Sequence, residues 1–129
     1  MTGLRVPVAP PATFDPVLAS IPQARSFVLE RLADAPVDRE VALLLTSELV
    51  TNAIRHAGTP FEVDVVLTPG GQVRVSVSDA SAVLPHPVVA APEAQSGRGL
   101  FFVEHYSQSW GVEPTRTGKR VWFVLACGS

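Results

Sequence analysis

The fold is decided by residues 61–79, which read FEVDVVLTPGGQVRVSVSD. In the first half of this stretch apolar side chains alternate with acidic ones, and in the second half valines alternate with polar residues. This two-residue period predicts two strands, Phe61–Leu67 and a second one that begins near Val73, each with one buried face. Residues 68–71 between them, Thr-Pro-Gly-Gly, suit a type II turn. The stretch therefore predicts an antiparallel hairpin.

Asp79 breaks the alternation at the end of the second strand. It shares parity with Val73, Val75 and Val77, so its side chain is predicted to point into the protein. A carboxylate is unfavourable there unless a polar group meets it. Asp79 could accept a hydrogen bond from the exocyclic amine of a ligand, or it could cap a turn with Ser81.

Two helices are predicted before the hairpin. The first covers Ser20–Ala35, with Ser20 as a good N-cap and a proline just past its end. The second covers Asp38–Ala57, with Asp38 as its cap and Gly58 as its stop signal.

One face of the second helix carries a polar arc. At 100° per residue, four side chains fall within about 100° of one another. These are Glu48, Asn52, Arg55 and His56. The oxygen of Asn52 is a hard ligand that suits Mg²⁺, and Glu48 one turn earlier can serve as a general base. A solvated helix face is the alternative interpretation of this pair.

After the hairpin, residues 80–96 read as a long proline-rich loop. A helix is then predicted to open at Ser96-Gly97-Arg98-Gly99-Leu100 and to run to about Gln108. The Gly97-Arg98-Gly99 turn could present backbone N–H groups and a guanidinium to phosphate oxygens, although a lone Gly-x-Gly is a weak signal.

The chain ends in a strand predicted over Arg120–Ala126. Gly118-Lys119-Arg120 brings two cations to its start, and an exposed basic turn is the simplest interpretation. Two helices, a hairpin, a loop, a helix and a closing strand indicate an α+β fold. We expect a two-layer sandwich in which helices cover one face of a mixed, mostly antiparallel sheet.

Composition limits the function classes. The 129 residues are 47% hydrophobic and 17% charged, with a formal net charge of -2. A single domain with a real core is expected, and a broad basic surface for nucleic acid or lipid is not. One cysteine, Cys127, excludes an internal disulfide. Residues 1–13, rich in Pro and Ala, are expected to form a flexible arm before a domain at 14–129, in a cytoplasmic protein without a membrane anchor.

Several catalytic motifs are missing from the sequence. Gly118-Lys119-Arg120 lacks the upstream glycine and following Ser or Thr of a P-loop. The sequence has no Gly-x-Ser-x-Gly elbow and no His-Arg-Asp loop, and its histidines lack metal-ligand spacing.

Four segments in order resemble the boxes of the GHKL ATPase superfamily. Residues 47–57, SELVTNAIRHA, resemble its N box, and residues 75–81, VSVSDAS, resemble its adenine-binding box. Residues 97–103, GRGLFFV, are similar to its second glycine box, and residues 110–123 to the end of its compact bacterial branch. That branch holds the anti-sigma-factor serine kinases of the SpoIIAB/RsbW type and their actinobacterial relatives. The resemblance implies the Bergerat-type ATP-binding fold.

The resemblance also implies roles for individual residues. It places Asn52 on Mg²⁺ bridging the triphosphate, Glu48 as general base, and Asp79 on the adenine amine. It places Gly97, Arg98, Gly99 and Leu100 at the phosphates and residues 82–95 over the nucleotide as a lid. Other residues that it brings near ATP are Arg55, His56, Ser81 and Lys119.

The chain departs from the superfamily pattern at three places. Its adenine box reads Asp-Ala-Ser where an Asp-x-Gly is frequent, and Lys119 and Arg120 stand where many members carry a threonine. The expected lid has no glycine between Asp79 and Gly97. Lys119 is expected to reach a phosphate or solvent.

By this resemblance the protein is an ATP- and Mg²⁺-dependent serine/threonine kinase that acts as a switch regulator. Its substrate would be a STAS-type anti-sigma-factor antagonist, a sigma factor could be a second partner, and a homodimer is expected. The alternative is a non-catalytic module that sequesters a partner under nucleotide control. A histidine-kinase catalytic domain fits less well, because no phosphoacceptor helix is present.

Overall fold

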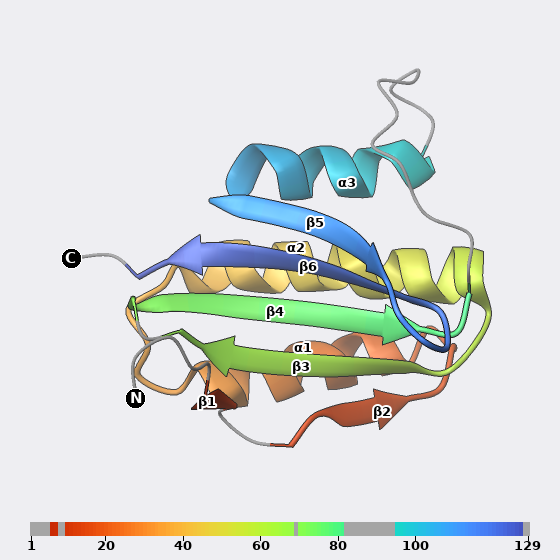
Figure 1. The fold of residues 1–129 in the computed structure, drawn as a ribbon, viewed down its shortest axis with the longest axis horizontal. Coiled ribbons are helices and arrows are strands. Elements are labelled where there is room, and N and C mark those ends of the chain that lie inside the picture. Colours follow the sequence, from red (N-terminus) through yellow and green to blue (C-terminus); the bar gives the residue numbers. More distant parts are fainter. Residues whose placement is uncertain (1–5, 8–9, 69, 82–94, 128–129) are drawn as a thin grey trace.

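The computed structural model describes residues 6–7, 10–68, 70–81 and 95–127 (Figure 1). The helices in this part of the chain are α1 (Ser20–Leu32), α2 (Arg39–Asn52) and α3 (Gln95–Tyr106), and the π-helical segment η1 (Ala53–Ala57) continues α2. The strands are β1 (Val6–Pro7), β2 (Ala12–Phe14), β3 (Phe61–Leu67), β4 (Gln72–Asp79), β5 (Ser109–Pro114) and β6 (Lys119–Ala126).

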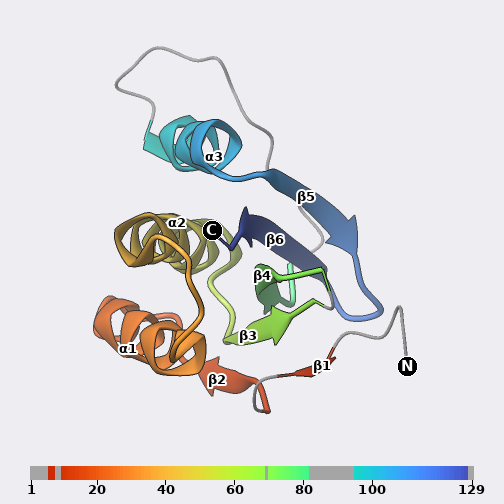
Figure 2. The same cartoon turned by 90° about the vertical axis from the view of Figure 1, so that its left-hand side faces the viewer.

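The strands form one sheet in the order β1-β3-β4-β6-β5, and β2 also pairs with β3. Every pairing among the described residues is antiparallel. The three helices lie on one side of this sheet (Figure 2). The protein is therefore an α+β sandwich of two layers, as the order of the predicted elements indicated.

The predicted hairpin is confirmed. β3 and β4 pair from Phe61 opposite Asp79 to Leu67 opposite Val73, which is the register that the alternating pattern requires. The positive φ of 79° occurs at Gly71, one residue later than a type II turn predicts. A left-handed glycine just after the turn is typical of hairpins whose turn is followed by a bulge.

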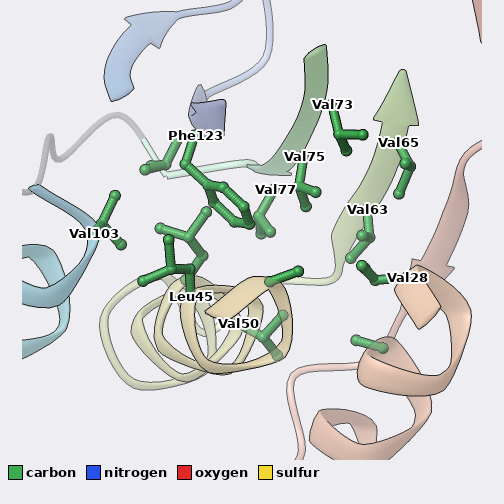
Figure 3. Close-up of a cluster of buried hydrophobic side chains, with 14 of the residues drawn as sticks. Val28, Leu45, Val50, Val63, Val65, Val73, Val75, Val77, Val103 and Phe123 are labelled. Atoms are coloured by element: carbon green, nitrogen blue, oxygen red, sulfur yellow. The ribbon is translucent and has the colours of Figure 1, made fainter. Parts of the chain in front are cut away.

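The core fills the space between the sheet and the helices (Figure 3). Each strand of the hairpin contributes alternate valines, and β6 contributes Phe123, which is fully buried. The helices contribute Val28 from α1, Leu45 and Val50 from α2, and Val103 from α3. Each such side chain stabilises the fold by about 1.5–3 kcal/mol relative to an exposed one, so this core holds α2 and β4 in a fixed relation.

The first helix differs from its prediction at the N-terminus. Ser20 is its first residue rather than its cap, and Ala19 precedes it without a capping side chain. The buried hydroxyl of Ser20 instead donates a hydrogen bond to the carbonyl oxygen of Asp15 (2.7 Å). Ser20 therefore fixes the preceding loop rather than the helix N–H groups.

The same helix ends at Leu32, before the predicted Ala35. Ala33 adopts a positive φ of 48°, which a residue with a β-carbon rarely does. The guanidinium of Arg39 donates to the carbonyl oxygens of Ala33 and Ala35. Through Ala33, this side chain satisfies a carbonyl group at the C-cap, where a helix leaves carbonyls without a partner in the helix.

The second helix is confirmed at both ends, but its last turn is not α-helical. The Asp38 side chain accepts a hydrogen bond from the Val41 amide (3.1 Å), as predicted for its cap. Gly58 ends the segment in the left-handed region, with φ 65°. Between them, Ala53–Ala57 forms the π-helical η1. Short π-helical segments occur frequently at functional sites.

Three strands and the end of α3 also differ from what the sequence analysis describes. β5 carries a glycine and a proline and lies at the sheet edge, paired with β6, so its sequence gives little strand signal. β1 and β2 take up part of the stretch expected to be a flexible arm, since Val6–Pro7 and Ala12–Phe14 both pair with β3. The helix α3 ends at Tyr106, before the predicted Gln108.

Among the described residues, no helix combines the length and the apolar composition that crossing a bilayer requires.

Candidate functional site

Segments that are distant in the sequence meet at one end of the molecule. Figure 1 shows the end of β4, the start of β6, the end of α2 with η1, and the start of α3 on the same side. Thr59, just beyond η1, accepts a hydrogen bond from the amide of Ala80 (3.1 Å), just beyond β4. This bond ties the end of the second helix to the end of the central strand, which brings the N-box and adenine-box segments together.

Asp79 points into the protein, as its parity predicted. It is 6% exposed as a residue, and it lies in register between Phe61 of β3 and Lys119 of β6. Its Oδ1 accepts a hydrogen bond from the Ser81 amide (2.9 Å), so the turn-capping interpretation is also correct. The ligand-binding role predicted for this carboxylate is compatible with the cap, because a carboxylate has about four acceptor sites.

Lys119 forms a buried ion pair with Asp79. The distance from Nζ to Oδ1 is 2.8 Å, and the two side chains are 6% and 2% exposed. The interpretation of residues 118–120 as an exposed basic turn is wrong for Lys119, which is the first residue of β6. In this structure the ammonium of Lys119 contacts the carboxylate that is predicted to bind adenine. The sequence analysis had instead indicated a phosphate or solvent as its partner.

Gly118 makes this close approach possible. A β-carbon on Gly118 would lie 2.0 Å from the carbonyl oxygen of Asp79 and 2.6 Å from the Cα of Ala80. Both neighbours are backbone atoms that cannot rotate away. Only glycine therefore lets the end of the β5–β6 loop press against the end of β4.

Glu48 and Asn52 lie one turn apart on α2, as predicted, and both are partly exposed. Leu45 and Leu49 beside them are buried, so one side of the pair borders the core. Asn52 is the last residue of α2 and directly precedes η1. The pair is therefore open enough to meet a ligand and anchored by its apolar neighbours.

Arg55 and His56 are exposed and belong to η1. The arc predicted with a uniform 100° step does not apply to them, because the hydrogen bonds of a π-helix join residues five apart. Their predicted contact with the nucleotide remains a prediction.

The glycine box lies where a helix begins. Gly97, Arg98, Gly99 and Leu100 belong to the first half of α3, whose first residue is Gln95. The backbone position agrees with the predicted helix start. The predicted lid falls almost entirely on residues 82–94, which lie outside the described residues.

Sequence reasoning overlooked two supporting contacts. Thr59 carries the bond to Ala80, and its position between Gly58 and a proline was the available signal. Arg25 of α1 donates a hydrogen bond to Ser47 Oγ (2.6 Å), and Ser47 precedes Glu48. The contact joins the two helices beside the candidate general base.

The donor set can be compared with what a nucleotide and Mg²⁺ require. Asn52 offers a hard oxygen, Glu48 a carboxylate, and Asp79 a buried acceptor beside a cation. Among the described residues, no three His, Cys, Asp or Glu side chains gather into a metal site. These residues fit a metal ion that takes most of its ligands from phosphates and water, and they do not fit a protein-only metal centre.

Comparison with known proteins places this geometry in a family. The model of the histidine kinase-like ATPase domain matches residues 14–125. An uncharacterized protein of Streptomyces coelicolor is 36% identical over an alignment of 72 residues, and the match covers 52% of this chain and 68% of that protein.

A solved structure has the same fold. It contains the RsbU and RsbW domains of Rv1364c from Mycobacterium tuberculosis, with a TM-score of 0.65 and 20% identity over 92% of this chain. The chain spans 32% of the length of that structure. Because the family model runs from the last residue of β2 nearly to the end of β6 and includes the helices that hold the candidate site, the chain belongs to the histidine kinase-like ATPase domain family, whose name implies ATP as the ligand.

Proposed function

We propose that this chain is an ATP-dependent serine/threonine protein kinase that acts as a switch regulator of the anti-sigma-factor type, in the actinobacterial branch of the GHKL superfamily. The observation that carries the proposal is the buried carboxylate of Asp79 at the end of β4, on the side of the molecule where α2 ends and α3 begins. The match to an ATPase domain across residues 14–125 supports it.

In this proposal Asp79 binds the adenine base of ATP. An inward carboxylate is an acceptor fixed by the core on one side and by the Ser81 amide on the other. It can accept a hydrogen bond from the exocyclic amine of adenine. Since the carboxylate is nearly excluded from water, that bond is stronger than it would be at the surface.

The phosphates lie toward the start of α3. A helix N-terminus presents unpaired N–H groups and the positive end of the helix dipole, both of which favour anions. We assign Gly97, Arg98, Gly99 and Leu100 to this role on their position in the first half of α3. Asn52 would ligate Mg²⁺, which when bound neutralises charge on the phosphate oxygens.

Glu48 acts on the attacking hydroxyl. The oxygen of a partner's Ser or Thr forms a bond to the γ-phosphorus, the bond from that phosphorus to the bridging oxygen breaks, and ADP leaves. The proton of the hydroxyl passes to the Glu48 carboxylate. Glu48 is partly exposed on α2, as a base that must reach a protein substrate has to be.

The partners follow from the same family branch. We propose a STAS-type anti-sigma-factor antagonist as the substrate, a sigma factor as a second partner, a homodimer as the assembled form, and the cytoplasm as the location. The fold shared with the structure of the RsbU and RsbW domains of Rv1364c agrees with this choice of branch.

One observation favours a second candidate function, a module that sequesters a partner without phosphorylating it. Lys119 already pairs with the Asp79 carboxylate inside the protein itself. A domain whose base-binding acceptor is already paired could hold its partner-binding shape without ATP.

The test begins with calorimetry of the purified protein with Mg-ATP and Mg-ADP. The protein is then isolated with its native partner, incubated with ATP, and the partner is analysed by mass spectrometry for phosphoserine and phosphothreonine. ATP binding with a phosphorylated partner supports the kinase. ATP binding with an unmodified, stably bound partner supports the sequestering module, and absence of nucleotide binding contradicts both.

A further inference from the structure

The ion pair between Asp79 and Lys119 is built into the core of the sheet. The two residues face each other across β4 and β6. Their side chains are 2% and 6% exposed, and Lys119 Nζ lies 2.8 Å from Asp79 Oδ1. Gly118 is required for this approach, because its missing β-carbon leaves room for the Asp79 carbonyl. The pair is therefore a fixed structural feature and not a surface contact that solvent breaks easily.

This pair is difficult to separate. Removing one member of a buried ion pair leaves an uncompensated charge in a poorly polar environment, which is strongly unfavourable. The exocyclic amine of a purine is neutral, so it cannot replace the ammonium on the carboxylate without stranding both charges. A base that binds at Asp79 consequently meets Asp79 and Lys119 together.

We propose that Lys119 stays on Asp79 when a nucleotide binds, and that its ammonium reads the base as a second recognition group. The inference rests on the proposed function, since it deepens the role of the same site. Asp79 accepts a hydrogen bond from the exocyclic amine of adenine. Lys119 donates one to the ring nitrogen next to that amine.

The hydrogen-bonding capacity of the two groups allows this. An ammonium has three donors, of which Asp79 uses one, and a carboxylate has about four acceptor sites, of which Oδ1 already uses two for Lys119 and the Ser81 amide. An acceptor beside a donor matches the edge of adenine, where an amine lies beside an unprotonated ring nitrogen. The Asp79 side chain is 2% exposed, so a base that binds it must displace neighbouring atoms while the pair remains together.

In this arrangement Lys119 contacts the base of the nucleotide and not its phosphates. An ammonium held by Asp79 cannot at the same time follow the triphosphate toward the start of α3. The net effect is that recognition of the base depends on a cation, which makes the contact to the ring nitrogen a charge-assisted hydrogen bond.

The test compares three nucleotides by calorimetry on the intact protein. ATP has both edge groups, 1-deaza-ATP lacks the ring nitrogen, and purine riboside triphosphate lacks the amine. We expect each analogue to bind the wild-type protein about tenfold or more weakly than ATP, as expected for loss of a hydrogen bond to a charged group. This comparison needs no variant, so it holds even where substitution of Lys119 impairs folding.

Two variants then identify the group that reads the ring nitrogen. If thermal unfolding shows that the Lys119→Met variant is folded, it should bind ATP and 1-deaza-ATP with equal affinity. Arg116→Met removes an exposed cation from the loop that precedes β6 and should keep the wild-type preference for ATP. If the single variant does not fold, the neutral double variant Asp79→Asn/Lys119→Met replaces it. The double variant should also bind ATP and 1-deaza-ATP with equal affinity.

Each outcome of these titrations decides whether the inference, the proposed function, or both are kept. Equal binding of ATP and 1-deaza-ATP to the wild-type protein overturns the inference and leaves the proposed function standing. Tighter ATP binding by Lys119→Met also overturns it, because Lys119 would then compete with the base. Absence of ATP binding to the wild-type protein overturns the proposed function and the inference with it.

Discussion

Gly118 packs directly against the backbone of Asp79 in the candidate site. A β-carbon on Gly118 would lie 2.0 Å from the carbonyl oxygen of Asp79, far inside van der Waals contact. Since Lys119 follows Gly118 directly, this approach positions the ammonium that pairs with the Asp79 carboxylate. The geometry of the ion pair therefore depends on a residue that has no side chain.

Gly118→Ala should destabilise the protein and weaken ATP binding. The added methyl group meets backbone atoms, so β6 must shift away from the end of β4. We expect the free energy of unfolding to fall by about 1–3 kcal/mol, as for overpacked sites. Urea denaturation measures the loss of stability, and calorimetry measures the loss of ATP affinity.

Gly70→Ala provides the matched control for this prediction. A β-carbon on Gly70 would meet nothing within 4 Å. The control should therefore change the free energy of unfolding by no more than about 0.5 kcal/mol. If Gly118→Ala is as stable as this control, the contact between Gly118 and Asp79 is looser than the structure indicates.

Asp79 and Lys119 should be strongly coupled in a double-mutant cycle. Asp79→Leu and Lys119→Met each leave one buried charge alone, and each should lower the free energy of unfolding by about 3–5 kcal/mol. The double variant leaves no charge in the core and should be more stable than either single variant. Chemical denaturation of the four proteins measures the coupling, and effects that simply add would refute a buried pair.

Much of this site could be predicted from local sequence patterns. The two-residue period of the hairpin determined which side of β4 faces the core, so the inward direction of Asp79 followed from Val73, Val75 and Val77. The cap at Asp38 followed from side-chain chemistry. In each case the deciding interaction joins residues close in sequence or lying on one regular strand.

The partner of Asp79 could not be predicted in the same way. Lys119 is 40 residues away in sequence, and the two meet only through the register of β4 and β6. The π-helical η1 could not be predicted either. The spacing of apolar residues does not show whether backbone hydrogen bonds join residues four apart, as in an α-helix, or five apart, as in a π-helix. The strand β5 could not be predicted because Gly111 and Pro114 weaken the strand signal. In the structure, Gly111 leaves space for the ring of Trp122.

Asn52→Ala should remove the magnesium dependence of nucleotide binding. The variant loses the amide oxygen that we assign to the metal, so its affinity for Mg-ATP should fall about tenfold or more. Chelation of magnesium should weaken ATP binding to the wild-type protein and have little effect on the variant. Titration calorimetry with and without chelator measures both changes.

Asn52→Asp is the control for the metal assignment, because it keeps an oxygen ligand at the same position. It should retain magnesium-dependent binding. Should Asn52→Ala bind Mg-ATP as tightly as the wild-type protein, the role of Asn52 would be limited to the junction between α2 and η1.

Glu48→Gln should separate nucleotide binding from phosphotransfer. The amide cannot take the proton of the attacking hydroxyl, so transfer to the partner should slow by a factor of about 10²–10⁴. ATP affinity should stay within about twofold of the wild-type value, because no bond between Glu48 and ATP itself is proposed. Transfer is measured as radiolabel incorporated into the partner, and affinity by calorimetry.

Glu104→Gln on α3 is a suitable control, since it neutralises an exposed carboxylate on another helix to which no role in transfer is assigned, and it should leave transfer unchanged. If Glu48→Gln transfers phosphate at the wild-type rate, Glu48 is not the general base. If the wild-type protein binds ATP and holds its partner without any transfer, the kinase assignment fails and the sequestering module remains.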